Sequence, residues 1–206
     1  MTEPRLCSAD RSSRAELRRR KLIDTARNLF IERGFHATGV AQIARESGIA
    51  VGQMYRDFAS KEDVVAALVE EDCATFLRAD ALKKAISNGD SDHMMTWLLS
   101  LLEPHTDREG KRLFAEILAE SARNERIAAI FTSLQLELRA TILAALAQLA
   151  PDPKLEKQRS LLADMVLTFS LGILHYELMV PDLGVQAVVE EMQNFMVERV
   201  KTLSKA

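Results

Sequence analysis

The chain has 206 residues, of which 27 are lysine or arginine, 30 aspartate or glutamate and 4 histidine, giving a net charge of −3. A hydrophobic fraction of 48% with 28% charged residues excludes a disordered chain, a collagen-like repeat and a disulfide scaffold. We expect a cytoplasmic protein without a membrane partner, because the N-terminus is polar and no uninterrupted apolar run approaches a bilayer span. Two distant cysteines, Cys7 and Cys73, are expected to be reduced thiols in that compartment.

The charge is distributed unevenly along the chain. Residues 11–61 hold eleven basic and five acidic residues, a net charge of +6, whereas residues 62–206 carry −8. A basic head on an acidic body predicts contact with a polyanion that is confined to the head.

The predicted elements are all helices, because alternating strand-like runs bounded by turn residues are absent from the sequence. The first helix covers residues 15–33, and Gly34 supplies the left-handed residue that stops it. Two short helices follow at residues 40–47 and 51–58, with Gly48 at the turn between them. Two short helices that meet at a glycine have the spacing of a helix-turn-helix, whose second helix enters a DNA groove.

A long fourth helix is expected from Ser60, its N-cap, to about residue 85, with two carboxylates in its first turn. Longer helices follow, and segments rich in proline, glycine or aspartate separate them. They are expected at residues 91–102, 108–122, 124–149, 154–179 and 184–203. The sequence therefore predicts a head of three helices that the fourth helix joins to a bundle of longer ones.

Further motifs lie at fixed spacing through the head: Ala26-Arg27-Asn28-Leu29-Phe30, Gly34-Phe35, Ala37-Thr38, Ile43-Ala44, Ser47-Gly48-Ile49, Gly52, Met54-Tyr55, Phe58 and Ser60-Lys61-Glu62. In this order and spacing, the stretch from residue 17 to about residue 76 resembles the DNA-binding domain of the TetR family of bacterial transcriptional regulators. The resemblance implies an all-α fold with an N-terminal three-helix DNA-binding domain over residues 16–76, its helix-turn-helix lying at about 39–58. Residues 77–206 would form a C-terminal helical ligand-binding and dimerisation bundle.

The resemblance also implies roles for individual residues of the head. Thr38 is expected to cap the second helix and to offer its hydroxyl or backbone N–H to a DNA phosphate. Tyr55 and Lys61 are expected to contact phosphates as well, the lysine with help from a helix N-terminus. Gln53 and Arg56 are the candidate base readers, since glutamine pairs with adenine and arginine with guanine in the major groove.

Other residues of the head modify this expected interface. Gly52 would let the recognition helix approach DNA closely, and Arg18 and Arg20 belong to a basic run that would lie over the backbone or minor groove. The family commonly has serine and lysine where this chain has Ala50 and Val51. Val51 can meet a thymine methyl instead of a phosphate, which predicts an atypical operator.

The later helices are rich in large apolar residues, and the resemblance implies that they enclose a pocket for a small apolar effector. The candidate lining residues are Trp97, Phe114, Phe131, Phe169, His175 and Tyr176. The last two long helices have more apolar surface than a terminal hairpin could bury, which predicts a homodimer through a four-helix bundle. The candidate interface residues are Leu162, Val166, Ile173, Val188, Met192 and Phe195.

No motif in the sequence supports an enzyme. The phosphate-binding patterns GxxxxGK[ST] and GxGxxG are absent, as is the Glu-x-x-His signature of a di-iron bundle. Four scattered histidines and two distant cysteines do not form a metal-ligand set. We therefore expect no catalytic residues, no metal and no cofactor.

The sequence predicts a dimeric repressor that binds a double-stranded DNA operator and is released from it by a small apolar ligand. The fourth helix would transmit the effect of the ligand, because it extends from the head into the body. The alternative is an all-α dimeric ligand-binding protein whose head binds DNA weakly or non-specifically. Ala50 and Val51 leave this alternative open, whereas the basic head with Thr38, Tyr55 and Lys61 favours the repressor.

Overall fold

The computed structural model describes residues 6–77, 79–103, 108–180, 182 and 184–205, with the side chains of residues 6–12 and 73–81 outside that description. Every regular element in this part of the chain is a helix, which confirms the all-α prediction. The packing divides the chain into two units. The first comprises Met1–Glu71 and Arg112–Phe131, and the second comprises Asp72–Lys111 and Thr132–Ala206. This division differs from the predicted boundary at residue 76, because a segment distant in sequence packs with the head.

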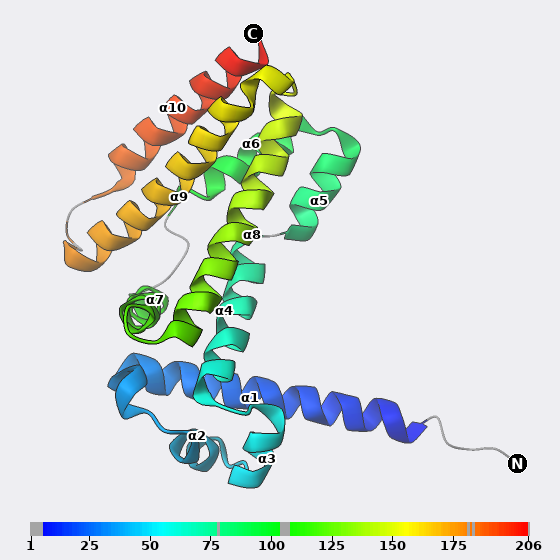
Figure 1. Ribbon diagram of the computed structural model, residues 1–206, viewed down its shortest axis with the longest axis vertical. Helices are drawn as coiled ribbons and strands as arrows, with labels where there is room; N and C mark the ends of the chain where they lie inside the picture. Colours follow the sequence, from blue (N-terminus) through cyan, green and yellow to red (C-terminus); the bar gives the residue numbers. More distant parts are fainter. Residues whose placement is uncertain (1–5, 78, 104–107, 181, 183, 206) are drawn as a thin grey trace, which may run out of the picture. The chain divides into compact units, whose positions relative to one another are not determined.

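The first unit begins with the three helices that the sequence predicts. They are α1 (Leu6–Ala37), α2 (Val40–Ser47) and α3 (Val51–Asp57), and α2 and α3 lie on one side of the long α1 (Figure 1). Apolar side chains from all three helices are completely buried, among them Leu22, Phe30, Ile43 and Met54. These positions recur at helical spacing, so each helix turns one apolar face inward.

Two glycines set the path of the chain between these helices. Gly34 interrupts α1 with φ 80° and ψ 162°, a backbone conformation that is essentially restricted to glycine. Gly48 ends α2 with φ 68°, and its N–H donates to the carbonyl groups of Ala44 and Arg45. Both positions confirm the breaks predicted from the sequence.

The fourth predicted helix is two helices in the structure. Helix α4 covers Lys61–Leu77 and α5 covers Ala79–Asn88, so the prediction of one helix to residue 85 is wrong. Residues 72–82 contain neither glycine nor proline, so the sequence does not indicate the break between α4 and α5. The start of α4 is as predicted, since the N–H of Asp63 donates to Ser60 Oγ at 3.2 Å and the N–H of Ser60 donates to Asp63 Oδ2 at 3.0 Å.

The remaining helices lie close to the predicted ranges. They are α6 (Ser91–Ser100), α7 (Arg108–Ser121), α8 (Glu125–Leu149), the short 3₁₀ helix η1 (Pro153–Leu155), α9 (Glu156–Met179) and α10 (Gln186–Ser204). Helices α9 and α10 run antiparallel (Figure 1). Their buried residues share one core with residues of α5, α6 and α8, which forms the interior of the second unit.

Two segments are apolar and long enough, by length and composition alone, to cross a membrane: Glu125–Leu149 and Pro153–Met179. These segments are α8 and the stretch formed by η1 and α9. Both helices contribute core residues to the second unit, and a buried core helix has the same composition. Only 22% of each apolar window is buried within the described chain, which leaves apolar side chains of both helices at the surface.

Substitution of the two turn glycines is expected to destabilise the first unit. Gly34→Ala would force a side chain into a glycine-only conformation and bring its Cβ to 3.2 Å from Glu116 Oε2, at a cost of about 1–3 kcal/mol. Gly48→Ala is expected to cost about 1–2 kcal/mol. Gly52→Ala is the control, because Gly52 is helical with open space around its Cβ position, so alanine is expected to be neutral or stabilising. Urea unfolding followed by circular dichroism measures all three, and a Gly34→Ala protein as stable as Gly52→Ala would contradict the account.

Candidate nucleic-acid interface

Helix α3 has a buried side and an exposed side. Met54 is completely buried, whereas Val51 and Tyr55 are 42% and 55% exposed. The side chains at the exposed or half-buried positions are those predicted to meet DNA: Val51, Gln53, Tyr55 and Arg56, with Gly52 between them. A Cβ at Gly52 would meet no atom within 4 Å, so the surface is open there to an approaching molecule. Helix α3 thus presents one solvent-facing side with the residue types that read base edges.

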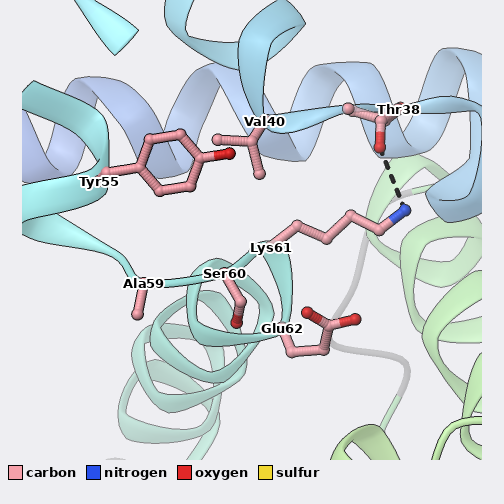
Figure 2. A pocket seen from close by; sticks show the side chains of 8 residues that line it. Thr38, Val40, Tyr55, Ala59, Ser60, Lys61 and Glu62 are labelled. Carbon is pink, nitrogen blue, oxygen red and sulfur yellow. Dashed lines mark hydrogen bonds between the residues drawn. The ribbon is translucent and has the colours of Figure 1, made fainter. Parts of the chain in front are cut away.

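An open groove of about 370 Å³ lies beside this face of α3 (Figure 2). It is lined by Thr38, Gly39, Val40, Tyr55, Ala59, Ser60, Lys61 and Glu62. The starts of α2 and α4 therefore border the same hollow, with Tyr55 of α3 between them. Backbone N–H groups at helix N-termini, together with a hydroxyl and an ammonium group, suit an anion such as a phosphate.

Lys61 is partly engaged within the protein. Its Nζ donates to the carbonyl oxygen of Thr38 at 3.2 Å (Figure 2). It also donates to the carbonyl oxygen of Phe35 at 2.7 Å and lies 3.9 Å from the centroid of the Phe35 ring. Partial burial lowers the pKa of the Lys61 ammonium below its usual range, while Glu62 and Glu120 act in the opposite direction. An ammonium group has three N–H donors, and the two carbonyl groups take up two of them.

The predicted cap on α2 is wrong. The N-cap residue is Gly39, which has no side chain, and the Thr38 hydroxyl instead donates to the carbonyl of Gly34 at 2.9 Å. Thr38 is buried, because its side chain satisfies backbone groups at the end of α1. Its backbone N–H donates to the carbonyl of Phe35 at 3.3 Å, so both groups predicted to contact a phosphate are engaged within the head. At the start of α3, Ala50 makes no side-chain cap.

Arg18 is tied to the end of the recognition helix. Its guanidinium donates to both carboxylate oxygens of Asp57, with Nε–Oδ2 2.5 Å and Nη2–Oδ1 2.8 Å. The hydrogen bond from Arg18 lowers the pKa of the Asp57 carboxyl below its usual range. Arg19 donates to the Asp57 carbonyl oxygen at 3.3 Å and lies 4.3 Å from the centroid of the Phe58 ring. Spacing along the chain does not indicate this pairing, because Arg18 and Asp57 lie on different helices 39 residues apart.

Other cations of the head face solvent. Arg20 is exposed, as expected for a residue that meets DNA. Lys21 is exposed as well, and its Nζ lies 3.9 Å from the position that a Cβ on Gly48 would occupy. Lys21 is therefore next to the turn that precedes α3, a position that periodicity along α1 does not indicate.

Helix α7 contacts the end of α1 within the first unit. The N–H of Phe35 donates to Glu116 Oε2 at 3.3 Å, directly after the break at Gly34. Glu120 is buried, its Oε2 accepting from Arg123 Nε at 2.6 Å and lying 3.8 Å from His36 Nδ1. Two carboxylates of α7 thus meet the segment that leads into α2.

The junction of α7 and α8 contacts the first turn of α4. Asn124 Nδ2 donates to Glu62 Oε1 at 3.1 Å. Arg126 donates to Asp63 Oδ1 at 2.7 Å and to Ser60 Oγ at 3.1 Å. Ser60 and Glu62 also line the groove, so a displacement of the α7–α8 junction would reach it.

The six candidate pocket residues are divided between the two units. Phe114 and Phe131 pair within the first unit, with ring centroids 5.4 Å apart. In the second unit Trp97 is buried in the core and Phe169 packs against it. His175 and Tyr176 are exposed on α9, and their role as lining residues stays a prediction. Among the described residues, no three histidine, cysteine, aspartate or glutamate side chains come together as metal ligands.

Three of the six candidate interface residues are also corrected. Leu162, Val166 and Ile173 are buried inside the chain, because α9 carries large apolar residues on more than one side and these face its own core. Met192 packs against the same core, whereas Val188 and Phe195 are 55% and 42% exposed. The other large apolar residues exposed on or just after α9 are Leu161, Leu171, Tyr176, Met179 and Val180.

Residues 22–68 match the family model of bacterial regulatory proteins of the tetR family. The chain is 27% identical over 126 residues to the HTH-type transcriptional regulator UidR of Escherichia coli K12, an alignment that covers 60% of this chain and 62% of UidR. It is 46% identical over 65 residues to the HTH-type transcriptional repressor KstR2 of Rhodococcus jostii, covering 32% of this chain and 30% of KstR2. The alignments thus span less than two thirds of these relatives.

Two solved structures share the fold along most of the chain. A transcriptional regulator from Pseudomonas aeruginosa PAO1 gives a TM-score of 0.74 at 18% identity, over 91% of both chains. The SmeT–triclosan complex gives a TM-score of 0.66 at 20% identity, over 86% of this chain and 90% of the other. These similarities confirm the helical fold of both parts of the chain.

The Arg18–Asp57 pair predicts a pH dependence of stability. A carboxyl whose pKa is lower in the folded state contributes stability above the unfolded value, about 3.9, and loses it as pH falls through the folded value. Asp57→Asn is therefore expected to be less stable than the wild type at pH 7, with the difference closing below about pH 4. Asp24→Asn, an exposed aspartate on α1, is the control and should show no such difference. Urea unfolding between pH 3 and pH 7 measures this, and a constant difference across the range would disprove it.

Proposed function

Because the chain belongs to the TetR family of bacterial regulatory proteins, we propose that it is a transcriptional repressor that binds a double-stranded DNA operator. This family acts on DNA rather than as an enzyme, and the chain is not an enzyme. We further propose that the repressor is a homodimer and that a small apolar molecule releases it from DNA.

The observation that carries the proposal is the exposed face of α3 beside the anion-compatible groove. With α3 in the major groove, Gln53 and Arg56 would contact base edges and Val51 a thymine methyl. The Tyr55 hydroxyl and the remaining donor of Lys61 would hold the phosphates that flank the major groove of the DNA. The net charge of +6 on residues 11–61 supports the same surface as the DNA-binding side.

Exposed apolar residues on α9 and α10 support the homodimer. Val188 and Phe195 are large, exposed and two helical turns apart on α10, so they lie on one face of that helix. Exposed apolar residues on α9, such as Leu161 and Met179, add to the surface that a second copy would cover. A two-fold dimer would present two copies of α3 to successive major grooves of a near-palindromic site.

The contacts of α7 and α8 with the head support release by a ligand. Glu116 holds the backbone after Gly34, and Asn124 and Arg126 hold the first turn of α4. A ligand that favours another position of these helices would shift the head as well, so ligand and DNA would oppose each other. SmeT, which shares this fold, binds the small apolar molecule triclosan in its solved complex.

The alternative function is that of a dimeric ligand-binding protein whose head binds DNA without sequence preference. One observation favours it: Ala50 leaves α3 without a side-chain cap. Sequence preference separates the two functions, because a protein that contacts only the backbone binds all duplexes equally.

Selection from a randomised duplex library is expected to enrich a near-palindrome. Gln53→Ala and Arg56→Ala should weaken binding to that operator by about 1–3 kcal/mol each and relax the base preference, because they remove base contacts. Tyr55→Phe should weaken binding to all sequences about equally, because it removes only a phosphate contact. Affinities measured at two salt concentrations distinguish these effects.

If no sequence is enriched at either salt concentration, the repressor is excluded and the ligand-binding alternative is favoured. If a palindrome is enriched but neither Gln53→Ala nor Arg56→Ala changes its recognition, the base readers are assigned wrongly. Small apolar molecules added to the operator complex test the release step, and the expected result is loss of binding.

Charged substitutions on the exposed face of α10 are expected to dissociate the dimer. In a two-fold interface each change occurs twice, so Phe195→Glu should raise the dimer dissociation constant by roughly 100-fold or more. Leu136→Glu is the control, because Leu136 is also an exposed apolar residue of the second unit but lies on α8. Sedimentation equilibrium measures both, and equal dissociation constants for the two variants would argue against this interface.

A further inference from the structure

We infer that Arg18 and Asp57 are a positioning pair for DNA recognition, which holds the end of α3 against α1 and so directs Gln53 and Arg56. Arg18 then acts on DNA through Asp57 rather than by touching a phosphate. The inference depends on the proposed function, because the direction of α3 matters only if α3 reads DNA.

The geometry of the pair fixes orientation as well as distance. Two parallel hydrogen bonds join the guanidinium to the carboxylate, with Nε–Oδ2 2.5 Å and Nη2–Oδ1 2.8 Å. The side chains are only 25% and 14% exposed, so water competes weakly for either partner. A bidentate arginine–carboxylate pair fixes the guanidinium and carboxylate planes relative to each other, which the ammonium group of a lysine could not do.

A second arginine holds the same residue by its backbone. Arg19 donates to the Asp57 carbonyl oxygen at 3.3 Å and stacks over the buried Phe58 ring at 4.3 Å. Arg18 and Arg19, neighbours on α1, therefore hydrogen-bond to the side chain and the main chain of Asp57, the last residue of α3. Arg56 immediately precedes this residue, so a shift of Asp57 moves the candidate guanine reader directly.

Helix α3 needs such a restraint because it is short and poorly capped. It has seven residues, and its N-cap Ala50 provides no side-chain hydrogen bond. A helix of two turns has little stability of its own, so tertiary contacts must set its direction. The buried Met54 fixes its depth, and the ion pair fixes its end.

The negative charge of Asp57 allows a positioning role to be distinguished from a purely electrostatic one. An aspartate beside the base-reading face would repel phosphates, and the arginine next to it cancels that charge. If electrostatics alone mattered, Asp57→Asn would strengthen binding to every duplex. If the pair positions α3, the same change weakens binding to the operator, so the two accounts predict opposite signs.

The experiment compares operator and random-sequence duplexes, with full-length Arg18→Gln, Asp57→Asn, Arg20→Gln and wild-type protein. Arg20 is the matched control, because it is an exposed arginine on the same helix. Arg18→Gln and Asp57→Asn are each expected to lower operator affinity roughly tenfold, while affinity for the random duplex changes less than about twofold. Arg20→Gln should weaken binding to both duplexes equally and reduce the salt dependence of the affinity by about one phosphate contact.

Two further variants separate positioning from loss of folding. The exchange Arg18→Asp with Asp57→Arg should recover most of the operator affinity that either single change loses, and Asp57→Glu should retain it. Unfolding of the head would instead lower affinity for both duplexes by the same factor, a result that overturns the inference.

Other outcomes are equally decisive. An increase in affinity for Asp57→Asn, or an Arg18→Gln protein that behaves like Arg20→Gln, would overturn the positioning role while leaving the repressor intact. A wild-type protein without any preferred sequence would overturn the proposed function, and the inference with it.

Discussion

The first turn of α4 is the constraint on which the first unit depends. Ser60 and Asp63 cap the turn reciprocally, which fixes the backbone from which the neighbouring side chains project. Lys61 reaches the carbonyl groups that end α1, while Arg126 and Asn124 bring the α7–α8 junction onto the same turn. Three segments distant in sequence therefore meet at one capped helix end, which also borders the groove beside α3.

Much of the positive charge of the head serves its structure. Arg18 and Arg19 hydrogen-bond to the end of α3. Lys61 donates two of its three N–H groups to backbone carbonyl groups. A net charge of +6 therefore overstates the number of cations that can each meet a phosphate. It still provides a positive field, since an ion pair within the head is already counted in the net charge.

Helices α7 and α8 would give the proposed release by a ligand a physical route that differs from the fourth helix expected from the sequence. The sequence suggested a single long helix from the head into the body, but that segment is two helices, α4 and α5. The polar contacts of Glu116, Asn124 and Arg126 lie instead within the head's own unit. Because hydrogen-bonded contacts of this kind are made or lost in discrete steps, they suit a switch between two arrangements.

Apart from the break between α4 and α5, the sequence by itself determined the helices, the turn at Gly48, the cap at Ser60 and the outward residues of α3, because local spacing and backbone chemistry specify these. Only the tertiary structure decided which partners the charged residues take and which apolar faces stay exposed. Arg18 and Asp57 meet because two helices cross, a relation that no spacing along one helix contains. Likewise Val166 and Met179 are both apolar residues of α9, yet packing buries the first and leaves the second exposed.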